Sequence, residues 1–82
     1  MEKISTESKL TGDEVIEKAV AFFGEGGFGL DIESREAGSV TFKGGGGGVV
    51  VETFPGEKGK TNVDLTSHEW DFQVKQFLGK IR

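Results

Sequence analysis

The chain has no cysteine and a single proline among its 82 residues. Without cysteine it can form neither a disulfide nor a zinc–thiolate site, so neither can reinforce the thin core of so short a chain. Stability must therefore come from helices packed on a sheet or from a partner chain. The length is that of one domain, and we expect residues 1–82 to fold as a single unit.

Long apolar runs are also missing. No stretch approaches the roughly 18 apolar residues that a membrane-spanning helix needs. The first ten residues, MEKISTESKL, lack the apolar centre of a secretory signal peptide. Together with the absence of cysteine, these features predict a soluble, cytoplasmic protein.

Positive charge is scarce, because 10 Lys and Arg stand against 14 Asp and Glu, giving a net charge of −4. Most of the basic residues lie within two or three positions of an acidic one. Proteins that bind nucleic acids or anionic membranes instead gather Lys and Arg into clusters. The sequence therefore predicts a solvated, acidic surface that binds no nucleic acid and no membrane.

Two segments carry the signature of a helix start. In LTGDEV, Thr11 and Glu14 have the spacing of a capping box, in which each side chain satisfies the backbone N–H of the other residue. In LTSHEW, Thr66 and Glu69 have the same spacing. In both motifs the flanking apolar residues can close as a hydrophobic staple. The sequence thus predicts helices that begin at residues 11 and 66.

Each predicted helix has one apolar face. The first ends at Gly24 and presents Val15, Ile16, Ala19, Val20 and Phe23. The second runs to the end of the chain and presents Trp70, Val74, Phe77, Leu78 and Ile81. We interpret Trp70 as an anchor of the core, with a position at the mouth of a pocket as the alternative.

Between the helices, apolar and polar residues alternate with the period of strands that face a core on one side. The first such segment, residues 28–35, is expected to turn Phe28, Leu30 and Ile32 inward. Residues 39–43, 49–54 and 60–66 follow as further strands, and residues 3–10 alternate weakly enough to predict an edge strand. The result is an α+β fold of order β-α-β-β-β-β-α, with a curved, antiparallel five-stranded sheet. Both helices are expected on one face, because each strand has only one apolar side.

Five consecutive glycines, Gly44 to Gly48, stand between two of these strands. Phosphate-binding and dinucleotide-binding loops need a helix after the glycines, and the phosphate loop also needs a lysine. Here a valine-rich strand follows instead. We interpret the run as a hairpin turn in which some glycines belong to the strand ends or to a bulge. An anion-binding nest is the alternative.

His68 is the only histidine and is expected in the first turn of the second helix, as a surface residue. A role as general base or metal ligand is the alternative, although no HxxxH or HxH pattern supplies further ligands. The acidic residues of the strands are expected on the open sheet face, where Arg35, Lys43 and Lys60 would form cross-strand ion pairs with them. These acids are Asp31, Glu33, Glu36, Glu52 and Asp64. We predict no catalytic residue, no metal and no cofactor.

Three apolar residues are expected outside the core. Phe72 lies about 200° around the helix from Trp70, and Val50 and Phe54 share the sheet face opposite the core. Single exposed apolar residues are common, whereas a cluster of them indicates a contact with a partner or a second copy. Phe72, Val50 and Phe54 are therefore the candidate interface residues.

The element order resembles the TATA-binding-protein-like and helix-grip folds, in which a curved antiparallel sheet wraps around a long C-terminal helix. The resemblance is carried by LTGDEVIEKAVAFF, by the strands through KTNVDLT and by LTSHEWDFQVKQFLGKI. The chain is also similar to a minimal START or polyketide-cyclase-like domain, and its last segment to small uncharacterised bacterial proteins. The resemblance implies DNA on the open sheet face, which the acidic composition opposes, or an apolar ligand between sheet and helix.

These observations predict a non-catalytic protein-interaction module that associates with itself through an exposed sheet edge or the Phe72 side of the last helix. The alternative is a carrier of a small apolar ligand, such as a fatty acid or isoprenoid, lined by Ile32, Phe42, Trp70 and Phe77. An enzyme that uses His68 is the third alternative.

Overall fold

The structure is a computed structural model that describes residues 2–82. Its five strands form one antiparallel sheet in the order β1-β5-β4-β3-β2. The predicted α+β class and the predicted β-α-β-β-β-β-α order are confirmed. The elements are β1 (Glu2–Ser8), α1 (Gly12–Phe23), β2 (Asp31–Glu36), β3 (Ser39–Gly44), β4 (Gly47–Pro55), the 3-10 turn η1 (Glu57–Gly59), β5 (Thr61–His68) and α2 (Asp71–Ile81).

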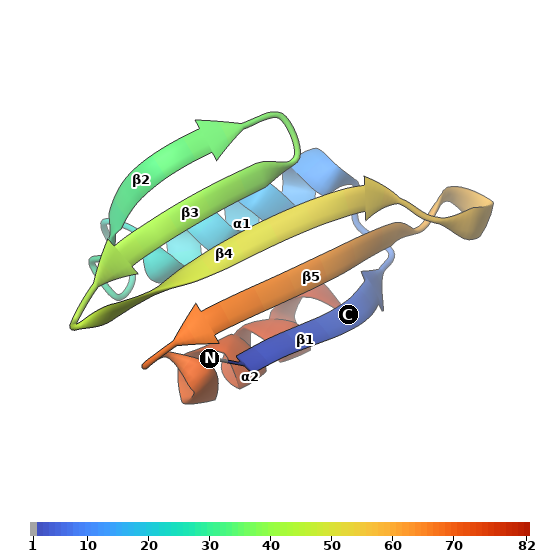
Figure 1. Cartoon of the computed structure of the whole chain (residues 1–82). Coiled ribbons are helices and arrows are strands. Elements are labelled where there is room, and N and C mark those ends of the chain that lie inside the picture. The colour runs from blue at the N-terminus through green and yellow to red at the C-terminus, as the bar shows by residue number, and fades with distance from the viewer. Residues whose placement is uncertain (1) are drawn as a thin grey trace.

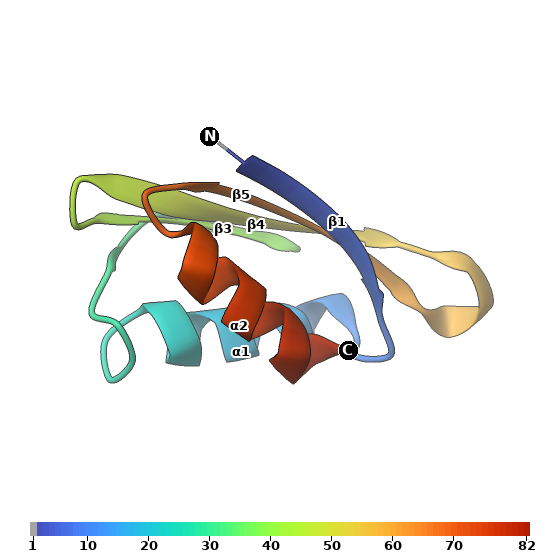
Figure 2. The same ribbon diagram turned by 90° about the horizontal axis from the view of Figure 1, so that it is seen from below.

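Both helices lie on the same face of the sheet (Figures 1 and 2). α1 packs against β3 and β4, and α2 packs against β5 and β1. β1 and β2 form the two opposite edges of the sheet, so α1 carries the chain from one edge to the other. No helix of residues 2–82 covers the second sheet face, and none of them is long and apolar enough to cross a membrane.

The core lies between the sheet and the helices and is centred on aromatic rings. Phe23 of α1 is fully buried, and its ring centroid lies 5.5 Å from that of Phe42 on β3 and 5.3 Å from that of Phe77 on α2. Aliphatic side chains from the inward positions of β3, β4 and β5 surround these rings. They are Val40, Val49, Val51, Val63 and Leu65.

The first predicted capping box is present at the start of α1. Thr11 Oγ1 accepts a hydrogen bond from the Glu14 backbone N–H at 3.1 Å, and Glu14 Oε1 accepts one from the Thr11 N–H at 2.9 Å. Gly24 caps the other end, where its N–H binds the Val20 carbonyl at 3.0 Å. Both predicted boundaries of this helix are therefore confirmed.

Replacing Thr11 with alanine is expected to lower the free energy of unfolding by about 1 kcal/mol, because one backbone N–H of the first turn loses its acceptor. Urea denaturation followed by circular dichroism measures the change. Thr11→Ser keeps the hydroxyl and is expected to stay within a few tenths of a kcal/mol of the parent. Equal losses in the two variants would show that the hydroxyl does not act as a cap.

The second predicted helix start is wrong. Residues 66–68 continue β5, where Thr66 pairs with Lys3 of β1 on one side and with Val50 of β4 on the other. The helix α2 begins only at Asp71, after Glu69 has turned the chain with a φ of 68°. A strand between two partners satisfies its backbone groups on both edges, and these hydrogen bonds outweigh one local capping box.

The inward face predicted for residues 28–32 is also wrong in part. Leu30 is buried, but Phe28 and Ile32 are each 44% exposed. β2 begins at Asp31, and its register with β3 shifts between Ile32 and Ser34, which marks a bulge at Glu33. Ile32 shares the core side with Phe42, but an edge strand has a neighbour on one side only and leaves such residues partly open.

The glycine run is a hairpin turn, as predicted. Gly45 and Gly46 are its central residues, and both have positive φ, at 59° and 82°, as a two-residue hairpin of the primed type requires. Gly44 ends β3 and pairs with Gly47 at the start of β4, so the remaining glycines belong to the strand ends.

Candidate interaction surfaces

The two edges of the sheet differ. β2 is short, entirely exposed and interrupted by its bulge, and it carries Asp31, Glu33, Arg35 and Glu36. β1 pairs with β5 over seven consecutive residues, from Glu2 to Ser8, without any shift of register. Bulges and dense charge are common means of blocking an edge strand. Within residues 2–82, β1 is therefore the regular edge that remains open.

The side chains of β1 alternate between the two faces of the sheet. Lys3, Ser5 and Glu7 are exposed on the outer face, while Ile4 and Thr6 are half-buried on the helix side. At the end of the strand, the buried Ser8 hydroxyl donates to the carbonyl of Ile81, accepts a bond from the Leu10 N–H, and so ties β1 to α2. The edge is thereby held in a fixed position on the core.

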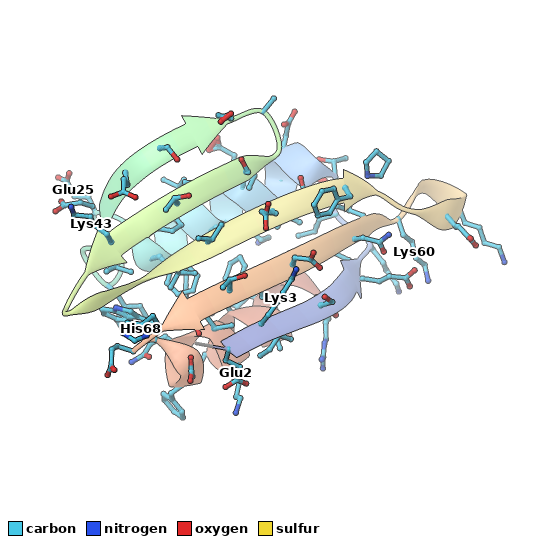
Figure 3. The ribbon with its side chains drawn as sticks, viewed as in Figure 1. Glu2, Lys3, Glu25, Lys43, Lys60 and His68 are labelled. Carbon is cyan, nitrogen blue, oxygen red and sulfur yellow. The ribbon has the colours of Figure 1, made fainter. Side chains whose placement is uncertain are left out.

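Charged side chains of alternating sign run along this edge. Lys3 Nζ lies 3.7 Å from Asp64 Oδ2, and Lys60 Nζ lies 3.7 Å from Glu7 Oε1. Figure 3 labels the two lysines, Lys3 on β1 and Lys60 just before β5. Between them, the Ser5 hydroxyl donates to Asp64 Oδ1 at 2.7 Å. The outer face of β1 thus presents a positive end at Lys3, a hydroxyl in the middle and a negative end at Glu7.

The three predicted interface residues do not form one patch. Val50 and Phe54 lie on the outer sheet face, separated along β4 by Glu52, and Phe54 is 46% exposed. Phe72 is 69% exposed on α2, in the helix layer on the opposite side of the sheet. The predicted exposure of Phe72 and the predicted facing of Val50 and Phe54 are confirmed, and their role in an interface stays a prediction.

The acidic residues of the strands lie on the outer face largely as predicted. Glu36, Glu52 and Asp64 belong to one row of paired positions across the sheet, and Lys43 Nζ lies 3.7 Å from Glu33 Oε2. The prediction was wrong for Arg35, because the bulge turns it to the helix side. There Arg35 Nη2 lies 2.6 Å from Glu17 Oε1 of α1.

His68 is exposed at the end of β5 and not in a helix, contrary to the prediction. Its Nε2 lies 4.0 Å from Glu69 Oε1. The carboxylate of Asp71, at the start of α2, accepts a hydrogen bond from the Ser67 hydroxyl, which lowers the pKa of Asp71. In residues 2–82, no three His, Cys, Asp or Glu side chains are placed to hold a metal ion. These groups therefore form surface and helix-start contacts.

Trp70 joins the start of α2 to the glycine turn. It is half-buried against the core, and its Nε1 donates a hydrogen bond to the Gly44 carbonyl at 2.9 Å. A Cβ at Gly45 would lie 2.8 Å from Cζ2 of the indole, so any larger residue at this position would crowd the Trp70 ring. The sequence predicted an anchor at Trp70 but gave no sign of its contact with the glycines.

The four residues proposed to line an apolar-ligand pocket do not border one open space. Phe42 and Phe77 are at most 1% exposed, and both contact Phe23 in the core. Ile32 lies at the β2 edge and Trp70 beside the glycine turn. A carrier of the predicted kind would need an open space between the sheet and α2. At that position the buried rings of Phe42 and Phe77 pack against the ring of Phe23.

One hollow on the surface lies between α1 and the β2–β3 turn, with a volume of about 580 Å³. Its lining is mostly charged and includes the paired Glu17 and Arg35 together with Asp13 and Glu36. Ligand pockets are usually lined by apolar and aromatic side chains around a few polar groups. This hollow has the character of a solvated groove.

Neither a protein-family model nor a curated protein shows significant similarity to this chain.

Proposed function

We propose that the chain is a non-catalytic protein-interaction module that binds its partner by adding a strand to the β1 edge. The observation that supports this proposal is the difference between the two sheet edges. β2 is bulged and densely charged, whereas β1 is regular over seven residues and has no neighbouring strand on its outer side within residues 2–82.

An edge strand leaves alternate backbone N–H and C=O groups without a partner in the sheet. An extended segment that lies along β1 can bind these groups in a continuous ladder, as in known cases of strand addition. The ladder would be intact over Glu2–Glu7, because the register of β1 has no shift there and only Ser8, at the end of the strand, is buried. At β2 the same ladder would be interrupted at Glu33.

Amide hydrogen exchange tests this proposal. As the protein concentration rises from about 10 µM to about 1 mM, alternate amides of β1 are expected to become protected, because strand addition occupies the groups that point away from β5. The β2 amides on the outer edge serve as the internal control and are expected to exchange at an unchanged rate. Protection that grows on α2 around Phe72, with β1 unchanged, would contradict the proposal.

Phe72→Asp separates the edge from the helix surface. If association uses β1, this variant is expected to associate as the parent does, because Phe72 projects away from the core. If association uses the Phe72 side of α2, the variant is expected to be a folded monomer. Light scattering over the same concentration range measures the difference.

A further inference from the structure

We infer that the strand added to β1 is the β1 strand of a second copy, paired antiparallel about a two-fold axis at Ser5. This inference rests on the proposed function and identifies the partner at the same edge. The two sheets would join into one continuous sheet, with the helices of both copies on the same side.

The alternation of side chains restricts the register. Residues directly opposite in an antiparallel pair point to the same face, so exposed residues of one copy must face exposed residues of the other. A register centred on Ser5 satisfies this rule and pairs the accessible residues Lys3 to Glu7 of the two β1 strands with each other. It places Lys3 opposite Glu7 of the second copy and Ser5 opposite Ser5 of the second copy.

The charges of the edge are self-complementary in this register. Lys3 already contacts Asp64 of its own chain, and Glu7 already contacts Lys60. A row of four charged side chains would therefore cross the junction on the outer face. It consists of Asp64 and Lys3 of one copy followed by Glu7 and Lys60 of the second copy, and the sign of the charge alternates along it. The two-fold axis repeats this row, so each dimer contains two new opposite-charge pairs.

The helix side of the junction also fits. Ile4 would lie opposite Thr6 of the second copy, which pairs an apolar side chain with a β-branched one. A register shifted by two residues places Lys3 opposite Ser5 or Ser5 opposite Glu7. It therefore loses both charge pairs. The register centred on Ser5 is thus the favoured one.

The same features limit the assembly to two copies. Lys3 and Glu7 hinder an unrelated strand, which does not match their charges, but they attract a second β1. The other edge of each copy is β2, whose bulge and charges block further strand pairing. Pairing of β1 with β1 therefore closes as a dimer and does not continue into a fibre.

Single charge reversals test the register. Lys3→Glu places like charges opposite each other at two symmetric positions, and so does Glu7→Lys. Each variant is expected to raise the dimer Kd by about 10- to 100-fold, because two attractive pairs become two repulsive pairs. Sedimentation velocity at a concentration where the parent is dimeric measures the loss, and circular dichroism confirms that the variants are folded.

Mixing the two variants gives the sharpest result. In the heterodimer of Lys3→Glu with Glu7→Lys, both opposing positions again carry opposite charges. An equimolar mixture is therefore expected to sediment as a dimer, although each variant alone is monomeric. Lys58→Glu in η1 and Glu25→Lys after α1 change the net charge by the same amounts outside β1 and are expected to stay dimeric.

Ser5→Cys provides a second measurement that does not depend on charge. The chain has no other cysteine, so every covalent dimer formed under mild oxidation must join position 5 of the two copies. Because Ser5 lies on the proposed axis, the variant is expected to cross-link at least about tenfold faster than Ser34→Cys on the exposed β2 edge. Equal rates for the two variants would overturn the register.

The outcomes separate the inference from the proposed function. If β1 becomes protected with concentration but both charge reversals remain dimeric alone, β1 binds a strand in another register and the inference is wrong. If the parent is monomeric throughout and β1 is never protected, the self-pairing is wrong, and strand addition at β1 survives only with a different partner. Recovery of the dimer in the mixture supports both the register centred on Ser5 and strand addition at β1.

Discussion

Replacing Phe23 with alanine is expected to lower the free energy of unfolding by about 3–5 kcal/mol. Phe23 is fully buried, and its ring lies within 5.5 Å, centroid to centroid, of the rings of Phe22, Phe42 and Phe77. It therefore joins α1, the sheet and α2 in one cluster. A domain of this size has a total stability of roughly 4–12 kcal/mol, so one substitution would remove a large part of it.

Urea denaturation followed by tryptophan fluorescence measures this loss, because Trp70 lies at the edge of the same core. Phe72→Ala is the matched control, since it removes the same ring from a position that is 69% exposed. The control is expected to change the stability by no more than about 0.5 kcal/mol. Similar losses for the two variants would show that α1 does not pack on the sheet through Phe23.

Replacing Gly47 with alanine is expected to cost about 3 kcal/mol, at the upper end of what overpacking usually costs. A Cβ at this position would lie 1.9 Å from the carbonyl oxygen of His68. That oxygen belongs to the backbone at the end of β5, so it cannot move aside without separating β4 from β5. The expected loss therefore comes from steric crowding and not from backbone conformation.

Gly46→Ala is the control for this substitution. Gly46 has a φ of 82° and no atom within 4 Å of an added Cβ. The variant is therefore expected to lose about 1 kcal/mol of unfolding free energy, from the left-handed backbone conformation alone. Thermal denaturation of both variants gives the comparison. If Gly47→Ala is as stable as Gly46→Ala, the backbone of β4 does not lie as close to the His68 carbonyl as the structure has it.

Sequence patterns predicted the elements whose signals are local. The capping box at Thr11 and the alternation in β3, β4 and β5 are set by residues close together in the chain, and they sufficed for the element order and the layer arrangement. The same kind of signal failed at Thr66, because pairing with β1 and β4 decided the conformation there. A local pattern predicts structure only where long-range pairing does not oppose it.

The edge β2 shows a second limit. Phe28 and Ile32 have the spacing of inward residues, but their burial depends on what covers them, and the bulge at Glu33 also turns Arg35 to the helix side. Neither an edge position nor a bulge can be read from alternation alone. The contact of Trp70 with Gly44 and Gly45 depends in the same way on residues distant in sequence.

The candidate interaction surface was predicted only in outline. The sequence indicated an exposed edge and an exposed Phe72, both of which the structure contains. It could not indicate which edge is regular, because that requires the register of β1 on β5 and of β2 on β3. The positions of Lys3 beside Asp64 and of Glu7 beside Lys60 also depend on how β1 pairs with β5.

The pairing of β1 with β1 is best tested by nuclear Overhauser contacts between copies, measured in a mixture of isotope-labelled and unlabelled protein. We expect intermolecular contacts between β1 protons of the two copies, centred on Ser5 and including Ile4 with Thr6. Intermolecular contacts confined to Phe72 on α2, or to Val50 and Phe54 on the outer face, would contradict it.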